Sequence, residues 1–131
     1  MVRPKHEHPT PGELEVLKIL WDRGPSTVRE VMEVLNRRRR RAYTSVMSLL
    51  NVMTDKGLLR RKPKGRAFTY QAKVPRGNTL GGLVGDLLGR AFEGSASALL
   101  VHLLDQSTPS AEELEEIRRT IDRYRRQQGE R

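Results

Sequence analysis

The sequence predicts a mainly α-helical protein that contains one small β-hairpin. Three observations lead to this fold class. Helix-capping motifs occur at 10–13, 27–30 and 110–113, and apolar residues at helical spacing follow each of them. Strand-like runs replace the helical spacing only between residues 58 and 72. The net charge of +9 is concentrated in the first part of the chain, which indicates two segments with different tasks.

The first helix is expected to begin at Pro11 and to end near Arg23. Thr10 and Glu13 can form a capping box, and proline suits the first helical position. Residues 1–9 before it are expected to form a flexible tail. The apolar residues of this helix are Leu14, Val16, Leu17, Leu20 and Trp21.

Two further helices follow. The second opens with a capping box at Thr27 and Glu30, and the third spans about Tyr43 to Lys56, with Gly57 in the position of a C-cap. The apolar positions expected to face inward are Val28, Val31, Met32, Leu35, Val46, Leu49, Leu50 and Met53.

A hairpin comes next, with strands at 58–62 and 67–72 around a turn at 63–66. Three helices followed by a basic hairpin is the order of a winged helix-turn-helix domain, in which the hairpin is the wing. We therefore predict such a domain over residues 10–75.

Residues 78–127 are expected to form an α-helical dimerisation region, because their three helical segments hold only two aromatic residues and make a thin core for a freestanding unit. Pro75 to Asn78 marks the boundary, and Ser95 is the expected cap of the middle segment. The residues predicted to pack against a second copy are Leu83, Leu87, Leu99, Leu103, Leu114, Ile117, Ile121 and Tyr124.

Three glycines, Gly81, Gly85 and Gly89, recur on one helix face, although each costs about 1 kcal/mol relative to alanine in a helix interior. Two explanations stay open: close approach of two helices, or a frayed linker.

The basic charge indicates a polyanionic partner, either nucleic acid or an anionic membrane surface. Residues 1–76 hold 18 Lys and Arg against 7 Asp and Glu, whereas residues 77–131 hold 7 against 9. Five consecutive arginines, 37–41, lead into the third helix. The stripe of that helix opposite its apolar side consists of Arg41, Thr44, Ser48, Asn51 and Asp55.

Short hydroxyl and amide side chains beside a dense positive patch suit a DNA major groove better than they suit a solvated helix face. We expect double-stranded DNA as the partner, with base edges contacted by Thr44, Ser45, Met47 and Ser48. The residues expected to contact phosphates are Arg38, Arg41, Tyr43, Arg61, Lys64 and Arg66. A structured-RNA binder and a protein-interaction module of the same fold are the alternatives.

No catalytic constellation, cofactor motif or cysteine is present, so we expect neither an enzyme nor a thiolate metal site. A metal role for the tail pair His6 and His8 is disfavoured, since no further ligands accompany it. The apolar stretches are too short to span a bilayer and no signal peptide is evident, so we expect a soluble cytoplasmic protein without membrane insertion.

The motifs together resemble the penicillinase-repressor family of the BlaI and MecI type, over about residues 10–125. The segments that carry the resemblance are 13–21, 28–31, 42–50 and 112–118. The resemblance implies a dimeric winged-helix repressor that binds palindromic operators.

In the antibiotic-responsive members, the signal of a membrane sensor protease leads to cleavage of the repressor in its dimerisation region. The matching bond here is His102–Leu103, where the family has Asn–Phe. This departure puts cleavage in question. The cysteine cluster of the copper-responsive branch is absent, so copper sensing of that type is not expected.

Overall fold

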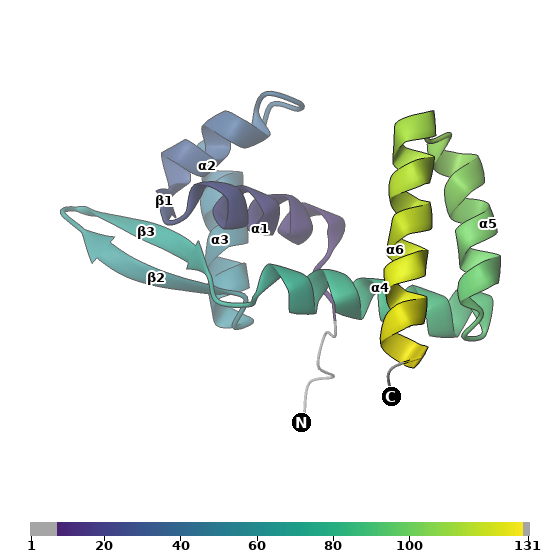
Figure 1. Cartoon of the computed structure of the whole chain (residues 1–131). Coiled ribbons are helices and arrows are strands. Elements are labelled where there is room, and N and C mark those ends of the chain that lie inside the picture. Colours follow the sequence, from purple (N-terminus) through teal and green to yellow (C-terminus); the bar gives the residue numbers. More distant parts are fainter. Residues whose placement is uncertain (1–7, 130–131) are drawn as a thin grey trace. The chain divides into compact units, whose positions relative to one another are not determined.

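The computed structural model describes residues 8–129 and has the predicted fold class, with helices and one small antiparallel sheet (Figure 1). The backbone divides into two compact units, residues 1–85 and 86–131, and the division falls inside a helix. The predicted domain limits, 10–75 and 78–127, stay predictions. In chain order the elements are α1 (Pro11–Arg23), β1 (Ser26–Thr27), α2 (Val28–Leu35), α3 (Tyr43–Asp55), β2 (Leu59–Lys64), β3 (Ala67–Ala72), α4 (Arg76–Phe92), α5 (Ala96–Ser107) and α6 (Ala111–Gly129).

The capping motifs determine where the first two helices begin. At α1, the Thr10 N–H donates to the Glu13 carboxylate at 2.9 Å, and the Glu13 N–H donates to the Thr10 hydroxyl at 3.2 Å. Thr27 and Glu30 make the same pair of bonds at α2. Two of the three predicted capping boxes are therefore confirmed. They satisfy backbone donors that would otherwise have no partner inside the helix. At the third, the Glu113 N–H donates to the Ser110 hydroxyl at 3.1 Å, and the described residues show no return bond from the Ser110 N–H to Glu113.

The hydrophobic core lies in the first unit, between α1, α2, α3 and the sheet. Its buried apolar residues are Val16, Leu17, Leu20, Val28, Val31, Leu35, Val46, Leu50, Met53, Leu59 and Tyr70. Most predicted inward positions are among them, while Leu49 and Trp21 pack at the margin of this core. The Trp21 indole N–H donates to the Val74 carbonyl at 2.9 Å, and this bond fastens the segment before α4 to the end of α1.

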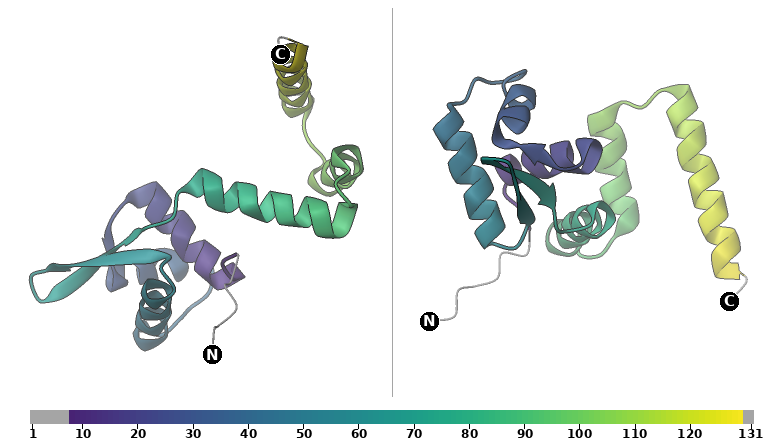
Figure 2. Two further views of the ribbon diagram at one scale, coloured as in Figure 1. Left: turned by 90° about the horizontal axis from the view of Figure 1, so that it is seen from below. Right: turned by 90° about the vertical axis from the view of Figure 1, so that its left-hand side faces the viewer.

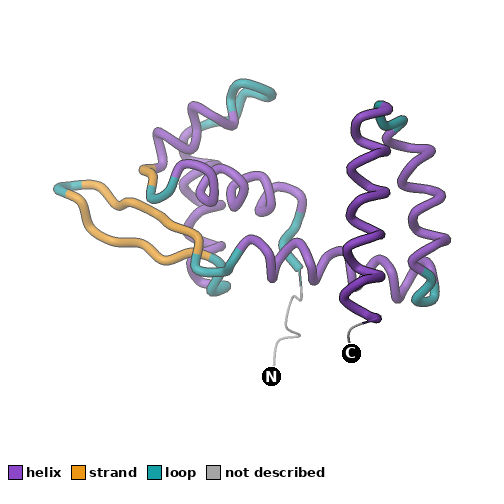
Figure 3. The backbone as a smooth tube through the Cα atoms, viewed as in Figure 1, coloured by secondary structure: helices purple, strands orange, loops and turns teal. Residues whose placement is uncertain are grey.

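The sheet has three strands in the order β1-β3-β2, all antiparallel (Figure 3). Strand β1 was not predicted, because two residues are too few to show an alternating pattern. Strand β2 also runs through Pro63 and Lys64, which were expected in the turn, so the turn consists of Gly65 and Arg66. Proline is tolerated there because β2 is an edge strand. Gly65 has a φ of 61°, which suits glycine. The hairpin extends away from the three helices (Figure 2).

Glu13 does more than cap α1. It is 3% exposed, and its carboxylate accepts a hydrogen bond from Lys56 Nζ at 2.7 Å, which joins the start of α1 to the end of α3. Burial alone would raise the pKa of Glu13. Hydrogen bonds from Lys56 and from the Thr10 N–H, together with the Lys56 charge, outweigh it and hold the pKa below its ordinary value.

Helices α4, α5 and α6 contrast with the elements before them, since they contain no fully buried residue. Helix α4 is continuous through Gly81, Gly85 and Gly89, and a Cβ added at any of them would meet no atom within 4 Å. Packing inside one chain therefore does not account for the glycine row. Within residues 8–129, no single helix is long and apolar enough to cross a membrane; only α4 and α5 taken together, across a bend of 104°, meet that criterion.

We predict that the Glu13–Lys56 pair makes stability depend on pH. Because folding lowers the Glu13 pKa, its contribution is complete above the unfolded-state pKa of about 4.3 and is lost as the pH falls through the folded-state pKa. Glu13→Gln should cost about 1–3 kcal/mol at pH 7, and the difference between wild type and variant should shrink below about pH 4. Chemical denaturation across pH measures this difference, and Glu33→Gln, an exposed carboxylate on α2, controls for net charge. A difference that is constant with pH would contradict the assignment.

Candidate nucleic-acid interface

The exposed face of α3 carries the side chains that were predicted to read DNA. Thr44, Ser45, Met47 and Ser48 are all exposed, while Val46, Leu50 and Met53 on the opposite side are buried. The helix therefore presents short polar groups and one flexible apolar side chain outward. These groups match the donors, acceptors and methyl groups of major-groove base edges.

The N-terminus of α3 also differs from those of α1 and α2. Its N-cap residue is Ala42, which makes no side-chain cap bond. The first backbone N–H groups of a helix have no partner within the helix, and they carry the positive end of the helix dipole. A DNA phosphate can accept from these groups, and Tyr43 is exposed beside them.

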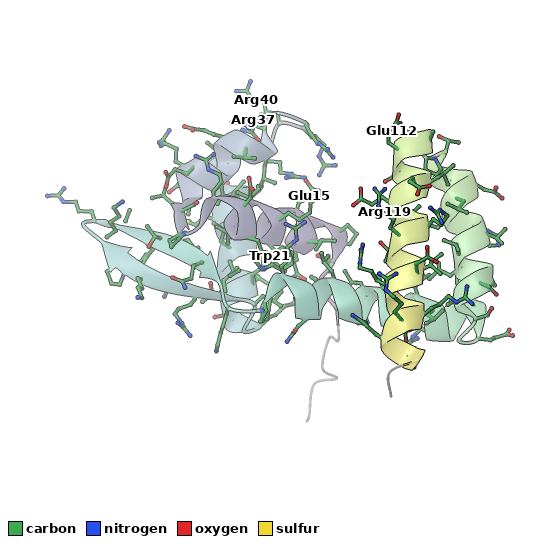
Figure 4. All side chains as sticks on the ribbon, viewed as in Figure 1. Glu15, Trp21, Arg37, Arg40, Glu112 and Arg119 are labelled. Carbon is green, nitrogen blue, oxygen red and sulfur yellow. The ribbon has the colours of Figure 1, made fainter. Side chains whose placement is uncertain are left out.

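The loop between α2 and α3 exposes four of the five consecutive arginines, at positions 37–40. Figure 4 labels Arg37 and Arg40 on this loop. None of the four has a carboxylate within salt-bridge distance in the described part of the chain. Their charge is therefore available to a polyanion. Arg38, predicted to contact a phosphate, is one of these four.

Arg41 has a different environment, because its side chain is only 17% exposed and is bound within the protein. Its Nη2 lies 3.3 Å from both carboxylate oxygens of Glu15 on α1. Its backbone N–H donates to Asn36 Oδ1 at 2.8 Å, which closes the loop after α2. In the unbound protein the Arg41 guanidinium is engaged by Glu15 through Nη2, and the predicted phosphate contact of Arg41 stays a prediction.

The wing places its cations on different sides of the hairpin. Arg61 pairs with Tyr70 across the strands and shares a face with it, whereas Lys64 lies on the other face and Arg66 lies in the turn. All three predicted wing residues are exposed. The Arg61 guanidinium lies over the Phe68 ring, 4.6 Å from the ring centroid. This cation–π contact limits the freedom of a side chain that would otherwise be mobile.

Asn51 connects the wing to α3, and the sequence did not reveal this role. The prediction placed Asn51 on the outer stripe of the helix, but the structure has it half-buried. Its Oδ1 accepts from the Tyr70 hydroxyl at 2.9 Å and from Arg61 Nη1 at 3.3 Å. Arg61 and Tyr70, which lie 10 and 19 positions after Asn51 in the sequence, thus meet at its side-chain oxygen. The helical spacing of apolar residues does not predict a contact with a distant strand.

The residues predicted for dimerisation lie on α4, α5 and α6 with much of their apolar surface uncovered. Leu87, Leu103, Leu114, Ile121 and Tyr124 are between 44% and 62% exposed. Leu83, Leu99 and Ile117 are half-buried. Exposed apolar side chains in this number are typical of a surface that binds another protein.

The predicted cleavage bond, His102–Leu103, lies in the middle of α5. The His102 ring is exposed and is tilted against the Phe92 ring, with 5.3 Å between their centroids. Among residues 8–129 no group of three or more His, Asp and Glu could hold a metal ion. The tail residue His6 lies outside the described residues.

The fold and the exposed face of α3 define a winged helix-turn-helix protein. Its sequence from residue 9 to residue 123 matches the family model described as the penicillinase repressor. The chain is 38% identical to the transcriptional regulator BlaI of Mycobacterium tuberculosis, over 84% of this chain and 81% of that relative. The chain belongs to the penicillinase-repressor family and is a DNA-binding transcriptional repressor of the BlaI and MecI type.

Two further comparisons agree with this family. The penicillinase repressor of Bacillus licheniformis is 22% identical over 91% of this chain and 93% of its own length. The solution structure of the DNA-binding domain of the repressor BlaI superposes with a TM-score of 0.50 and 23% identity, over 60% of this chain and 93% of that domain. At this identity the structural likeness bears on the fold alone.

We predict that Arg38 and Arg41 contribute to DNA binding in different ways. Arg38→Ala should reduce the slope of log affinity against log salt by about one unit, because a phosphate contact is lost. Arg41→Met should leave the slope unchanged and lower the stability of the fold by about 1 kcal/mol, because Glu15 loses its partner. Binding to duplex DNA over a salt series, together with thermal unfolding, measures both effects.

Glu15→Gln is the matched control for Arg41→Met, since it removes the same ion pair and keeps the arginine. It should reproduce the stability loss of Arg41→Met. A slope that falls by one unit in Arg41→Met but not in Glu15→Gln would show that Arg41 contacts DNA directly.

Proposed function

We propose that this repressor binds a palindromic operator as a homodimer and blocks transcription by occupying promoter DNA. The observation that carries the proposal is the arrangement of the first unit. The exposed polar face of α3, four exposed arginines before it and a basic wing after it all belong to one small domain. Relatives named as repressors support the same reading.

In this proposal α3 enters the major groove. Thr44, Ser45, Met47 and Ser48 approach base edges, because they lie in its exposed N-terminal half. The residues that position the domain on phosphates are Arg38, Tyr43, Arg61, Lys64 and Arg66. Arg41 holds the entry to α3 through Glu15.

The homodimer is proposed because the second unit cannot bury its own apolar residues. Its helices have no fully buried side chain, yet Leu87, Leu114, Ile121 and Tyr124 are among the large exposed apolar residues of the chain. A second copy would cover these surfaces and would present two reading helices related by twofold symmetry. Such symmetry matches a palindromic operator.

The proposal requires no catalytic group and no cofactor. A repressor acts on chromosomal DNA, so the location that follows from the proposal is the cytoplasm.

We predict that Ile121→Asp weakens dimerisation and operator binding together. Ile121 is 44% exposed in the single chain, so a charge there should leave the fold of the chain intact while disrupting a dimer contact. Sedimentation should show a shift towards monomer. Affinity for a full palindrome, located by footprinting of genomic DNA, should fall by roughly 10²-fold or more, while half-site affinity should stay unchanged.

Arg126→Ala is the control, because it changes an exposed position of α6 away from the Ile121 stripe. It should sediment like the wild type. If Ile121→Asp also remains a dimer, residues 78–127 do not provide the dimer contact in the way proposed here.

We propose proteolysis at His102–Leu103 as one route by which the repressor is released. A protease needs an extended backbone, so a bond in the middle of α5 becomes accessible only when this helix unwinds. Cleavage would separate α6 from the winged helix-turn-helix domain without changing that domain.

Under inducing conditions, mass spectrometry of the protein should detect fragments that end at His102. Val101–His102 and Leu103–Leu104 are the neighbouring bonds that the same spectra should show uncut. Induction with only full-length protein present would exclude this route and indicate a different mechanism of release.

A further inference from the structure

The orientation of the Asn51 side-chain amide follows from the chemistry of its neighbours. A guanidinium group has only N–H donors, so the Asn51 atom next to Arg61 must be the acceptor oxygen. With the amide turned the other way, two sets of donors would face each other. The oxygen therefore lies towards the wing and the amide nitrogen lies on the far side of Cγ.

Tyr70 reinforces this orientation. It is 2% exposed, and its hydroxyl donates to the same Asn51 oxygen at 2.9 Å. A carbonyl oxygen has two lone pairs, and the bonds from Tyr70 and Arg61 occupy both of them. Asn51 thus has no acceptor capacity left for another molecule.

The two N–H donors of the amide remain. In the described part of the chain, Asn51 Nδ2 donates no hydrogen bond. This nitrogen is not buried, so its donors are open to solvent. Asn51 also continues the helix stripe of Thr44 and Ser48, at spacings of four and three residues. The open donors belong to the same side of α3 as the predicted reading residues.

We propose that Asn51 is a further DNA-contacting residue that presents donors only, and that it donates to an acceptor on the operator. This inference rests on the proposed DNA-binding function. The bidentate contact of asparagine to adenine needs both an acceptor and a donor, and the wing has taken the acceptor. The partner is therefore an atom that only accepts: the N7 of a purine, guanine O6, thymine O4 or a phosphate oxygen.

The same contacts make Asn51 a link between α3 and the wing. Arg61 is held between the Asn51 oxygen and the Phe68 ring. A merely structural role through Arg61 is thus the competing explanation, and the experiment must separate it from a direct contact.

Three variants of the full-length protein serve this purpose. Asn51→Asp keeps oxygens for Tyr70 and Arg61 but removes the donors. Asn51→Ala removes the side-chain oxygen as well as the donors. It is measured in the wild type and in an Arg61→Ala background. Tyr70→Phe is the matched control, because it removes one bond to the oxygen and leaves the donors and the Arg61 bond in place. Affinities are measured on the operator and on all its single-base substitutions, and thermal unfolding reports the folded fraction.

Asn51→Ala should weaken operator binding by on the order of tenfold in both backgrounds. If the acceptor is a base, Asn51→Asp should change the preferred base at one position of each half-site, towards cytosine, whose amino group can donate to a carboxylate. If the acceptor is a phosphate, Asn51→Ala should weaken binding to all sequences equally and leave the salt slope unchanged, since a neutral donor releases no counterion. Tyr70→Phe should keep the wild-type base preference in either case.

The proposal is overturned if Asn51→Ala has no effect in the Arg61→Ala background and Asn51→Asp leaves every base preference unchanged. In that result Asn51 acts only by holding Arg61. A wild-type protein that shows no preference for any duplex would instead overturn the proposed function, so the two failures are distinguishable.

Discussion

Two carboxylates of α1 hold the two ends of α3, and the reading surface depends on both. Glu13 binds Lys56, the C-cap residue of α3, and Glu15 binds Arg41, which directly precedes its N-cap residue. Between these anchors, Val46, Leu50 and Met53 pack into the core. The close-packed apolar side chains set how the helix lies against the core, and the two ion pairs add a contact to α1 at each of its ends. The exposed residues of α3 are thereby presented in one register.

This arrangement divides the basic residues into two groups. Lys56 and Arg41 lie half-buried, and each forms an ion pair with a carboxylate of α1 that neutralises its charge within the domain. The arginines at 37–40 stay exposed and keep their charge for a polyanion. Counterion release counts only the cations that reach phosphates. The number of Lys and Arg residues in the sequence is therefore larger than the number of unpaired cations, because Arg41 and Lys56 each neutralise a carboxylate of α1.

The sequence predicted those features that depend on neighbouring residues. The two complete capping boxes, the C-terminal end of α3 before Gly57 and the existence of the hairpin follow from local hydrogen bonding and side-chain periodicity. Features that depend on a distant partner could not be predicted. In the sequence, Arg41 cannot be distinguished from the four arginines before it, because its partner Glu15 lies 26 residues away. In the sequence, Asn51 has the pattern of a surface residue, because its contact with Tyr70 depends on the tertiary fold. Strand β1 likewise forms only through its pairing with β3.

The two units reach stability by different means. The first has a closed core and anchored helix ends, so it can hold a reading surface by itself. The second has helices without a fully buried residue, and in our proposal it becomes stable only by covering its apolar surface with a second copy. Tethering two heads gains affinity without adding any contact to DNA, and that gain disappears when the tether fails. In our proposal, a rigid DNA-binding domain joined to a dimerisation region that is stable only in the dimer allows the repressor to bind firmly and still be released, because release acts on the dimerisation region alone.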